Sequence, residues 1–283
     1  MTPASLALVL GAAVFHSAWN FALKSESRRL EASLLALGAA VLLSAPVLLF
    51  HPLSAVSARA WGLVLLSGAF ETAYLLTLTA AYQIGDLSLV YPIARGSAPL
   101  VVMPMAVLVL GERVSASGLC GVGLVVAGIF ASQAGLLRSA AAAGARPAAA
   151  LALLTGVMIA GYSLVNKVGV ATTPVLLWAF LVLTVDTVLL TVVLWFRGGF
   201  AWPRAGAPRW RAAAIGVLML AAYLAILEAL TLAPVSYVVA GREVSIVVTA
   251  LAGALLLHER HSRRRVAGAV VIFAGLVVMA LSR

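Results

Sequence analysis

Charged side chains are scarce in this chain. Asp, Glu, Lys and Arg make up 10% of its 283 residues, and 64% of the residues are hydrophobic. A soluble domain carries roughly 25% charged residues, because its surface must face water. This composition therefore excludes a soluble domain and predicts an integral membrane protein.

Cysteine and the common catalytic motifs are also lacking. The single cysteine, Cys120, excludes a disulfide within the chain and a thiolate metal cluster. The sequence contains no G-x-x-x-x-G-K-[ST] loop for ATP, no H-E-x-x-H zinc motif and no serine-hydrolase elbow. We therefore expect no cofactor, no bound metal, no enzymatic activity and no transport driven by ATP on this chain.

Acidic residues are few, with 9 Asp and Glu against 19 Lys and Arg, which gives a net charge of +10. The basic residues gather at the ends of apolar segments, so we expect no nucleic-acid binding. Most of them fall in alternate connections, which the positive-inside rule places in the cytoplasm. These are Lys24, Arg28, Arg29, Arg138, Arg146, Arg197, Arg204, Arg209, Arg211, Arg260, Arg263, Arg264 and Arg265. Both termini would then lie outside.

Long apolar segments are what the sequence has instead. A helix that crosses a bilayer needs about 20 apolar residues. Ten segments qualify as spans, and the first lacks the basic start of a cleaved signal peptide, so we expect it to be retained. The ten spans are 3–24, 31–50, 60–84, 87–110, 115–136, 147–169, 173–196, 210–231, 234–257 and 264–282.

The two halves of the chain resemble each other. Arg242 follows Arg95 by 147 residues, and other features recur in the same order: "GER" (111–113) and "HER" (258–260), Gly121 and Gly268, Gly128 and Gly275, Trp19 with Lys24 and Tyr162 with Lys167. This predicts a first five-helix repeat at 1–138, a linker at 139–146 and a second repeat at 147–283, within one membrane domain. Five is odd, so the repeats would enter the membrane in opposite directions, as in many secondary transporters.

These ordered signatures resemble the EamA-type transporters of the drug/metabolite transporter superfamily, whose members include the YddG-type amino-acid exporters. The resemblance covers the whole chain. It implies an all-α fold of ten transmembrane helices, as two inverted five-helix repeats around a central cavity. It also implies export of a small metabolite across the bacterial inner membrane.

Ionisable residues inside the spans are the strongest candidates for function, because each costs about 2.5–3.5 kcal/mol at a helix centre. Arg95 and Arg242 hold matching places in spans four and nine. A guanidinium group suits a carboxylate or phosphate, through two parallel hydrogen bonds. We expect one of them, Arg95 by preference, to hold an anionic group of the cargo. The alternative is a salt bridge to Glu71, Glu228 or Asp186 that only joins helices.

Two prolines accompany Arg95. Pro99 and Pro104 each remove a backbone donor from span four and predict a break or kink there. Exposed backbone at membrane depth is tolerated where it faces protein or water, so span four would line a wet cavity. The alternative is a rigid kink that only shapes packing.

Further polar and aromatic residues complete the predicted site. His16 and Trp19 share a helical face with Asn20, and Glu71 is a candidate carrier of a coupling proton, unless it is salt-bridged. Tyrosines could stack on cargo or anchor helices at the interface. The predicted cargo-contacting set is Arg95, His16, Trp19, Glu71, Tyr74, Tyr91, Tyr162, Glu228, Arg242 and Glu243.

Other motifs favour scaffold roles. Ser115 and Ser262 are candidate N-caps of spans five and ten. The seven-residue spacing of Gly121 with Gly128, and of Gly268 with Gly275, predicts faces for close helix packing. We expect Lys24 and Lys167, the only lysines, to anchor span ends by snorkelling.

Together these patterns predict a secondary transporter, a monomer or homodimer in the lipid bilayer. Its substrate would be a small amino-acid-like molecule or organic anion, with protons as a candidate coupling ion. The alternative is a lipid flippase or scramblase that recognises a phosphate headgroup.

Overall fold

The computed structural model describes residues 1–24, 29–85, 87–142, 146–196, 209–246 and 263–282. These ranges contain helices and turns but no strand, which confirms the predicted all-α class. The α-helices are α1 (Pro3–Lys24), α2 (Arg29–Ser44), α3 (Ala58–Ile84), α4 (Leu87–Leu110), α5 (Ala116–Ala142), α6 (Arg146–Val170), α7 (Val175–Phe196), α8 (Arg209–Leu232), α9 (Val235–Arg242) and α11 (Arg263–Leu281).

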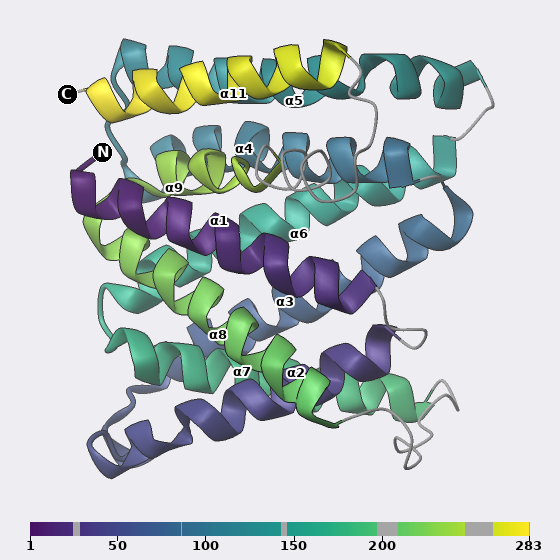
Figure 1. Cartoon of the computed structure of the whole chain (residues 1–283). Helices are drawn as coiled ribbons and strands as arrows, with labels where there is room; N and C mark the ends of the chain where they lie inside the picture. Colours follow the sequence, from purple (N-terminus) through teal and green to yellow (C-terminus); the bar gives the residue numbers. More distant parts are fainter. Residues whose placement is uncertain (25–28, 86, 143–145, 197–208, 247–262, 283) are drawn as a thin grey trace.

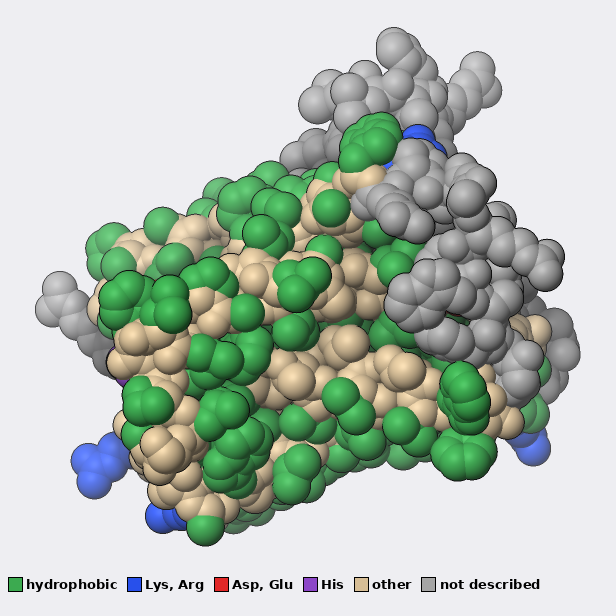
Figure 2. Space-filling view, turned by 90° about the horizontal axis from the view of Figure 1, so that it is seen from below, with side chains coloured by type: hydrophobic (Ala, Val, Ile, Leu, Met, Phe, Trp, Pro, Cys, Tyr) green, Lys and Arg blue, Asp and Glu red, His purple; other side chains and the backbone are tan. Residues whose placement is uncertain are grey.

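Length and composition show a chain that crosses a membrane several times. Among the described residues, α1, α3, α4, α6, α7, α8 and α2 with its 3₁₀ extension are long and apolar enough to span a bilayer. α5 and α11 contain shorter apolar stretches, 116–132 and 266–281. Hydrophobic side chains spread over the face seen in Figure 2, and the Lys and Arg side chains in that view lie towards its ends.

Most predicted spans agree with helices to within a few residues, and two ends differ. α2 stops at Ser44, and a 3₁₀ turn (Ala45–Leu49) completes the predicted span, because Pro46 lacks the N–H that a continuing α-helix needs. α5 continues to Ala142 through alanine-rich sequence that was predicted to be linker. Alanine has the highest helix propensity, which explains the extension.

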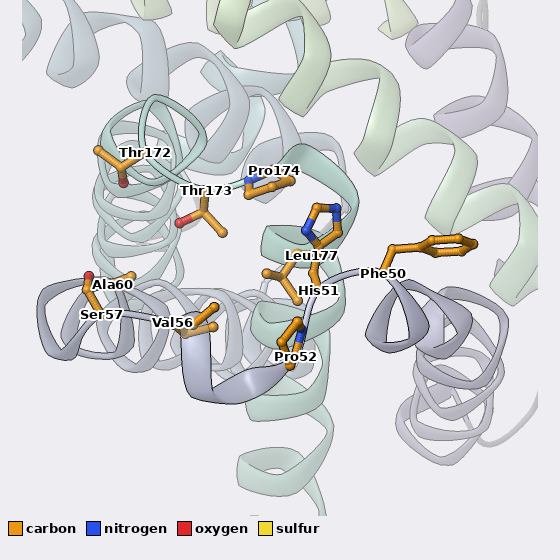
Figure 3. A pocket seen from close by; sticks show the side chains of 11 residues that line it. Phe50, His51, Pro52, Val56, Ser57, Ala60, Thr172, Thr173, Pro174 and Leu177 are labelled. Atoms are coloured by element: carbon orange, nitrogen blue, oxygen red, sulfur yellow. The ribbon is translucent and has the colours of Figure 1, made fainter.

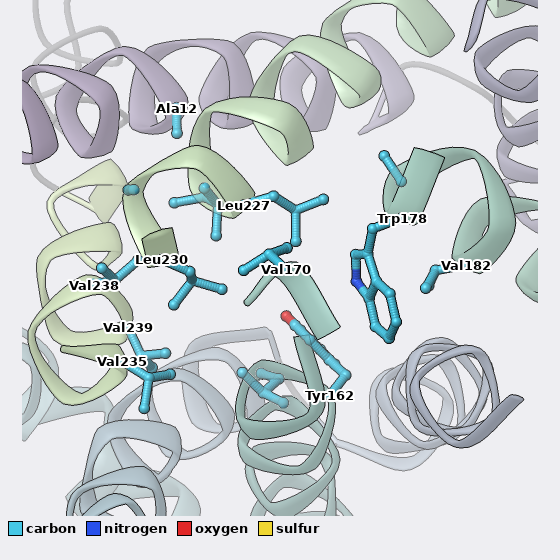
Figure 4. Close-up of a cluster of buried hydrophobic side chains, with 14 of the residues drawn as sticks. Ala12, Tyr162, Val170, Trp178, Val182, Leu227, Leu230, Val235, Val238 and Val239 are labelled. Carbon is cyan, nitrogen blue, oxygen red and sulfur yellow. The ribbon is translucent and has the colours of Figure 1, made fainter. Parts of the chain in front are cut away.

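The two halves are interleaved. Both termini lie at one end of the molecule, and α1 and α6 start from opposite ends (Figure 1). α1 packs against α8, and α6 packs against α3, so the first helix of each half lies on the third helix of the other. One buried apolar cluster joins α1, α3 and α4 of the first half to α6, α7, α8 and α9 of the second, with Ala12, Tyr162, Trp178 and Val238 among its members (Figure 4). The core is therefore shared between the halves.

Glycines bring α5 and α11 together, as their spacing predicts. A Cβ atom at Gly128 would lie 2.8 Å from the carbonyl oxygen of Gly268, and one at Gly275 would lie 2.6 Å from that of Gly121. Such distances are too short for any side chain, so the two antiparallel helices contact each other through backbone. These two helices form one edge of the molecule in Figure 1.

The short helix is α9, and span four is not broken at its prolines, whereas a kink there stays a prediction. α4 is one α-helix through Pro99 and Pro104. By contrast α9 has 8 residues and ends at Arg242, after which i→i+3 bonds link Glu243 to Ala240, Val244 to Gly241 and Ile246 to Glu243. The rest of predicted span nine, the "HER" signature and Ser262 lie outside the described residues.

Candidate functional site

Arg95 lies at the centre of a buried polar cluster built from three segments. Its Nη2 atom is 2.9 Å from Nε2 of His16 on α1, and it donates to Oγ of Ser245 at 3.3 Å. Its Nε atom is 3.3 Å from Oε2 of Glu243. Tyr91, one turn earlier on α4, places its ring centroid 5.7 Å from the guanidinium carbon. The guanidinium group thus joins α1, α4 and the end of α9.

Arg242 occupies the matching position in the second half but has a different environment. Its Nη2 atom donates to the hydroxyl of Tyr162 on α6 at 2.8 Å, and its guanidinium carbon is 5.7 Å from the centroid of the same ring. The ring of Tyr74, on α3, packs edge-on against Tyr162 at 6.0 Å. Among the described residues, the hydrogen-bond partner of Arg242 is therefore a neutral phenol.

Several charged atoms of this cluster are buried without a hydrogen bond from the described part of the chain. They are Nη1 of Arg95, Nε of Arg242 and both carboxylate oxygens of Glu243, although Oε2 still lies within ion-pair distance of Arg95. Leaving buried charged groups unpaired is costly. The described part of this cluster has two guanidinium groups and one carboxylate, so it carries an excess of positive charge and donors without a partner among these residues.

Glu71 belongs to a separate hydrogen-bonded network, whose other members carry uncharged side chains. Its Oε1 atom accepts hydrogen bonds from the hydroxyl of Tyr223 at 2.8 Å and from Nδ2 of Asn166 at 3.3 Å. Asn166 in turn accepts from Ser67 at 2.7 Å and from the indole of Trp178 at 2.9 Å. This network links α3, α6, α7 and α8, and the predicted salt bridge from Glu71 to an arginine is absent among these residues.

The two other predicted arginine partners lie elsewhere. Asp186 is buried on α7 and accepts a hydrogen bond from Thr72 at 2.7 Å. Glu228 is exposed near the end of α8, and among the described contacts none joins it to Arg95 or Arg242. The α8 helical face that points inward carries Tyr223, five residues before Glu228, and this spacing turns Glu228 away.

Of the remaining predicted residues, Trp19 is buried and packs edge-on against His16, with ring centroids 4.9 Å apart. The structure therefore gathers His16, Trp19, Tyr91 and Glu243 around Arg95. It gathers Tyr74 and Tyr162 around the other arginine, and the chain from Arg242 to Glu243 connects the two groups.

A pocket of about 380 Å³ lies away from this cluster (Figure 3). It opens between the segment 50–60 and the connection from α6 to α7, and Figure 3 shows His51 facing Pro174 and Thr173. None of the predicted site residues lines it. The chemistry described above is therefore independent of this pocket.

Sequence reasoning missed a polar corner where α8 meets α9. Glu112, in the "GER" signature, accepts hydrogen bonds from the backbone N–H of Val235 at 2.6 Å and from the hydroxyl of Ser236 at 2.8 Å. It caps the start of α9, which is the charge-favoured position for a carboxylate. Gly111 makes the preceding turn with φ of 67°, which favours glycine.

Lys167 binds the other side of this corner. Its Nζ atom donates to the carbonyl oxygens of Leu230 and, at 2.9 Å, Ala233, at the end of α8. The ammonium group therefore caps the end of α8, and its snorkelling role stays a prediction. The side chain of Lys24 lies outside the described residues. Ser115 accepts from the N–H of Gly118 at 3.2 Å, which confirms the predicted cap of α5.

A family model described as the EamA-like transporter family matches residues 4–132 and 146–281. The chain belongs to this family. This EamA-like protein is thus a multi-pass membrane transporter, and no curated protein sequence matches it. A solved structure described only as "Crystal structure of protein" has a similar fold, with a TM-score of 0.77 and 18% identity over 99% of this chain and 98% of that chain.

Proposed function

We propose that this EamA-like protein is a secondary transporter of a small amino-acid-like molecule or organic anion, and that Arg95 and Arg242 hold the anionic group of the cargo. The observation that carries the proposal is the set of buried guanidinium donors, Nη1 of Arg95 and Nε of Arg242, that lack a partner among the described residues. A carboxylate accepts such donors with charge-assisted hydrogen bonds. Cargo with an ammonium group could also use the free oxygens of Glu243.

Alternating access is the proposed mechanism. Inverted repeats support it, because exchanging the conformations of two inverted halves opens one site to alternate sides. The short helix α9 supports it as well, since it ends at Arg242 beside the cluster. Broken helices at membrane depth recur at the binding sites of secondary transporters. The proposed site then lies in a hydrated cavity between the halves.

Location, orientation and direction are part of the same proposal. The family resemblance supports the bacterial inner membrane and outward movement of cargo. The charge distribution supports cytoplasmic placement of the end at which α2, α6 and α8 begin, with both termini outside.

Proteoliposomes test the proposed function. Purified protein is assayed for uptake of labelled alanine, phenylalanine, aspartate and succinate, with Arg242→Met as the site variant. Arg113→Met is the matched control, because Arg113 is exposed on the connection after α4. We expect saturable uptake of at least one compound, lost in Arg242→Met and retained in Arg113→Met. Movement of fluorescent phospholipid without uptake of any compound would contradict the proposal and favour a flippase.

A further inference from the structure

The contact between Arg95 and His16 fixes the protonation of the imidazole. A guanidinium group only donates hydrogen bonds, so Nε2 of His16, at 2.9 Å from Nη2 of Arg95, must accept. The imidazole is then neutral, with its proton on Nδ1. A proton on Nε2 would place two donors against each other, so the bond from Arg95 and protonation of Nε2 are mutually exclusive.

The charges around His16 come from several helices. Arg95 and Tyr91 face it from α4, and Glu243 follows α9 on the far side of the Arg95 guanidinium. On α9, Arg242 is bonded to Tyr162, and Tyr237 lies near Ser115. The other helices packed on α1 carry Tyr223, bonded to Glu71, the exposed Glu228, and Glu31 in the first turn of α2. The nearest charge to the imidazole is therefore a cation.

An anion bound at Arg95 changes the sign of the charge closest to the His16 imidazole. Nη1 of Arg95 has no hydrogen-bond partner among the described residues, and one N–H of Nη2 becomes free when His16 stops accepting, while the other still donates to Ser245. Together Nη1 and Nη2 form the fork that binds a carboxylate through two parallel bonds. A carboxylate placed there is a negative charge beside His16, so it attracts an imidazolium where the bare guanidinium repels one.

We propose that His16 is a proton-binding site coupled to the anion site at Arg95. The inference rests on the proposed function, since it requires anionic cargo at this arginine. When the anion binds, Nε2 of His16 takes one proton from water, and its hydrogen bond from Arg95 is replaced by the anion. Arg95 keeps all its protons, and no covalent bond changes.

The coupling has a defined sign. Since the anion favours protonated His16, the proton favours the bound anion by the same factor. Affinity for the anion therefore rises as pH falls through the titration of His16. Each cargo molecule carries about one proton in the same direction, because the proposed site has one histidine. When the cargo is more concentrated inside the cell, its outward movement would carry protons out of the cell with it.

Coupled transport tests the inference. Proteoliposomes that contain trapped pyranine report internal pH while labelled alanine, phenylalanine, aspartate or succinate enters. Wild type is expected to move about one proton per substrate molecule and to accumulate substrate when the outside is acid. His16→Gln retains an acceptor for Arg95 but cannot titrate, so any substrate it moves enters without protons and without response to the pH gradient. His51→Gln, a matched change in the remote pocket, is expected to behave as wild type.

The outcomes separate the two proposals. Uptake by wild type without proton movement would overturn the role of His16 and leave the proposed transport intact. Proton movement that persists in His16→Gln would also overturn the role of His16 and leave the proposed transport intact. Absence of uptake for every compound would count against the proposed function itself.

A spectroscopic readout decides the role of His16 even if no compound is transported. The chain has 4 histidines, and the ¹⁵N imidazole signals of His16 are those that disappear in His16→Gln. We expect a neutral ring protonated at Nδ1 in wild type, and protonation at higher pH in the double variant Arg95→Met/Glu243→Leu, which lacks the opposing donor. An identical titration in both proteins would overturn the proposal.

Discussion

Arg95 and Arg242 hold the same place in the two repeats, but their surroundings differ. Arg95 lies on a continuous helix and contacts a carboxylate, a histidine and a serine. Arg242 ends a helix of 8 residues and donates to a single phenol. The comparison teaches that the two repeats carry matching cations and that only the first has an acidic partner among the described residues. Arg95 therefore has a larger share in folding, and Arg242 retains more charge for cargo.

The largest expected effect comes from Arg95→Met. This change leaves Glu243 buried without its ion-pair partner, and removing one partner of a buried pair costs about 3–5 kcal/mol. We expect a large loss of folded protein, measured by size-exclusion chromatography and thermal unfolding in detergent. Arg95→Met/Glu243→Leu removes both charges and should recover most of the folded yield while remaining inactive. A double variant no better folded than Arg95→Met would contradict the pairing.

Arg242→Met should cost less stability and yet abolish transport. It leaves one hydroxyl, that of Tyr162, without its partner, and an unpaired buried polar group costs about 1–3 kcal/mol. Thermal unfolding beside the Arg95→Met variant measures the difference directly. If Arg242→Met were the less stable of the two, the proposed division between folding and binding would be wrong.

Glu112→Ala tests how the short helix α9 is held. Loss of a helix N-cap costs about 0.5–2 kcal/mol, and α9 carries Arg242 at its end. We expect a modest decrease in thermal stability together with slower transport. Glu228→Ala, at an exposed position on α8, is the matched control and should change neither.

Ser245→Ala should have the smallest effect. Its hydroxyl accepts one bond of 3.3 Å from Arg95, which keeps its contacts with His16 and Glu243. A typical hydrogen bond contributes about 0.5–1.5 kcal/mol to stability. We therefore expect thermal unfolding to show a decrease in stability near the lower end of this range. A loss as large as that of Arg95→Met would show that the serine, rather than the carboxylate, holds the arginine.

The sequence was sufficient for the fold because membrane spans depend on local composition. Apolar length predicted the helices, and the spacing of Gly121 with Gly128 predicted the contact between α5 and α11. The break was assigned to the wrong helix, because Pro99 and Pro104 are strong local signals that surrounding packing can accommodate. The end of α9 has no proline to mark it.

The partners of buried charges were harder to predict than their presence. Arg95 binds Glu243 rather than Glu71, Asp186 or Glu228, and this choice depends on the rotation and depth of helices that are far apart in sequence. Glu112 and Lys167 were expected at span ends, but their roles as caps depend on where α8 and α9 meet. The sequence signal for the role of Glu112 was the recurrence of "GER" as "HER". This recurrence indicates that the position matters, but it does not predict which residues the glutamate contacts.

Equilibrium binding of labelled cargo is the most direct test of the central claim. The compound taken up best by wild type is titrated against purified wild type, Arg242→Met and Arg113→Met in detergent. A charge-assisted hydrogen bond contributes about 1.5–3 kcal/mol, so we predict that Arg242→Met weakens the Kd by at least about tenfold. Arg113→Met should leave the Kd unchanged. Equal Kd values for all three proteins would contradict the claim that buried guanidinium groups hold the cargo.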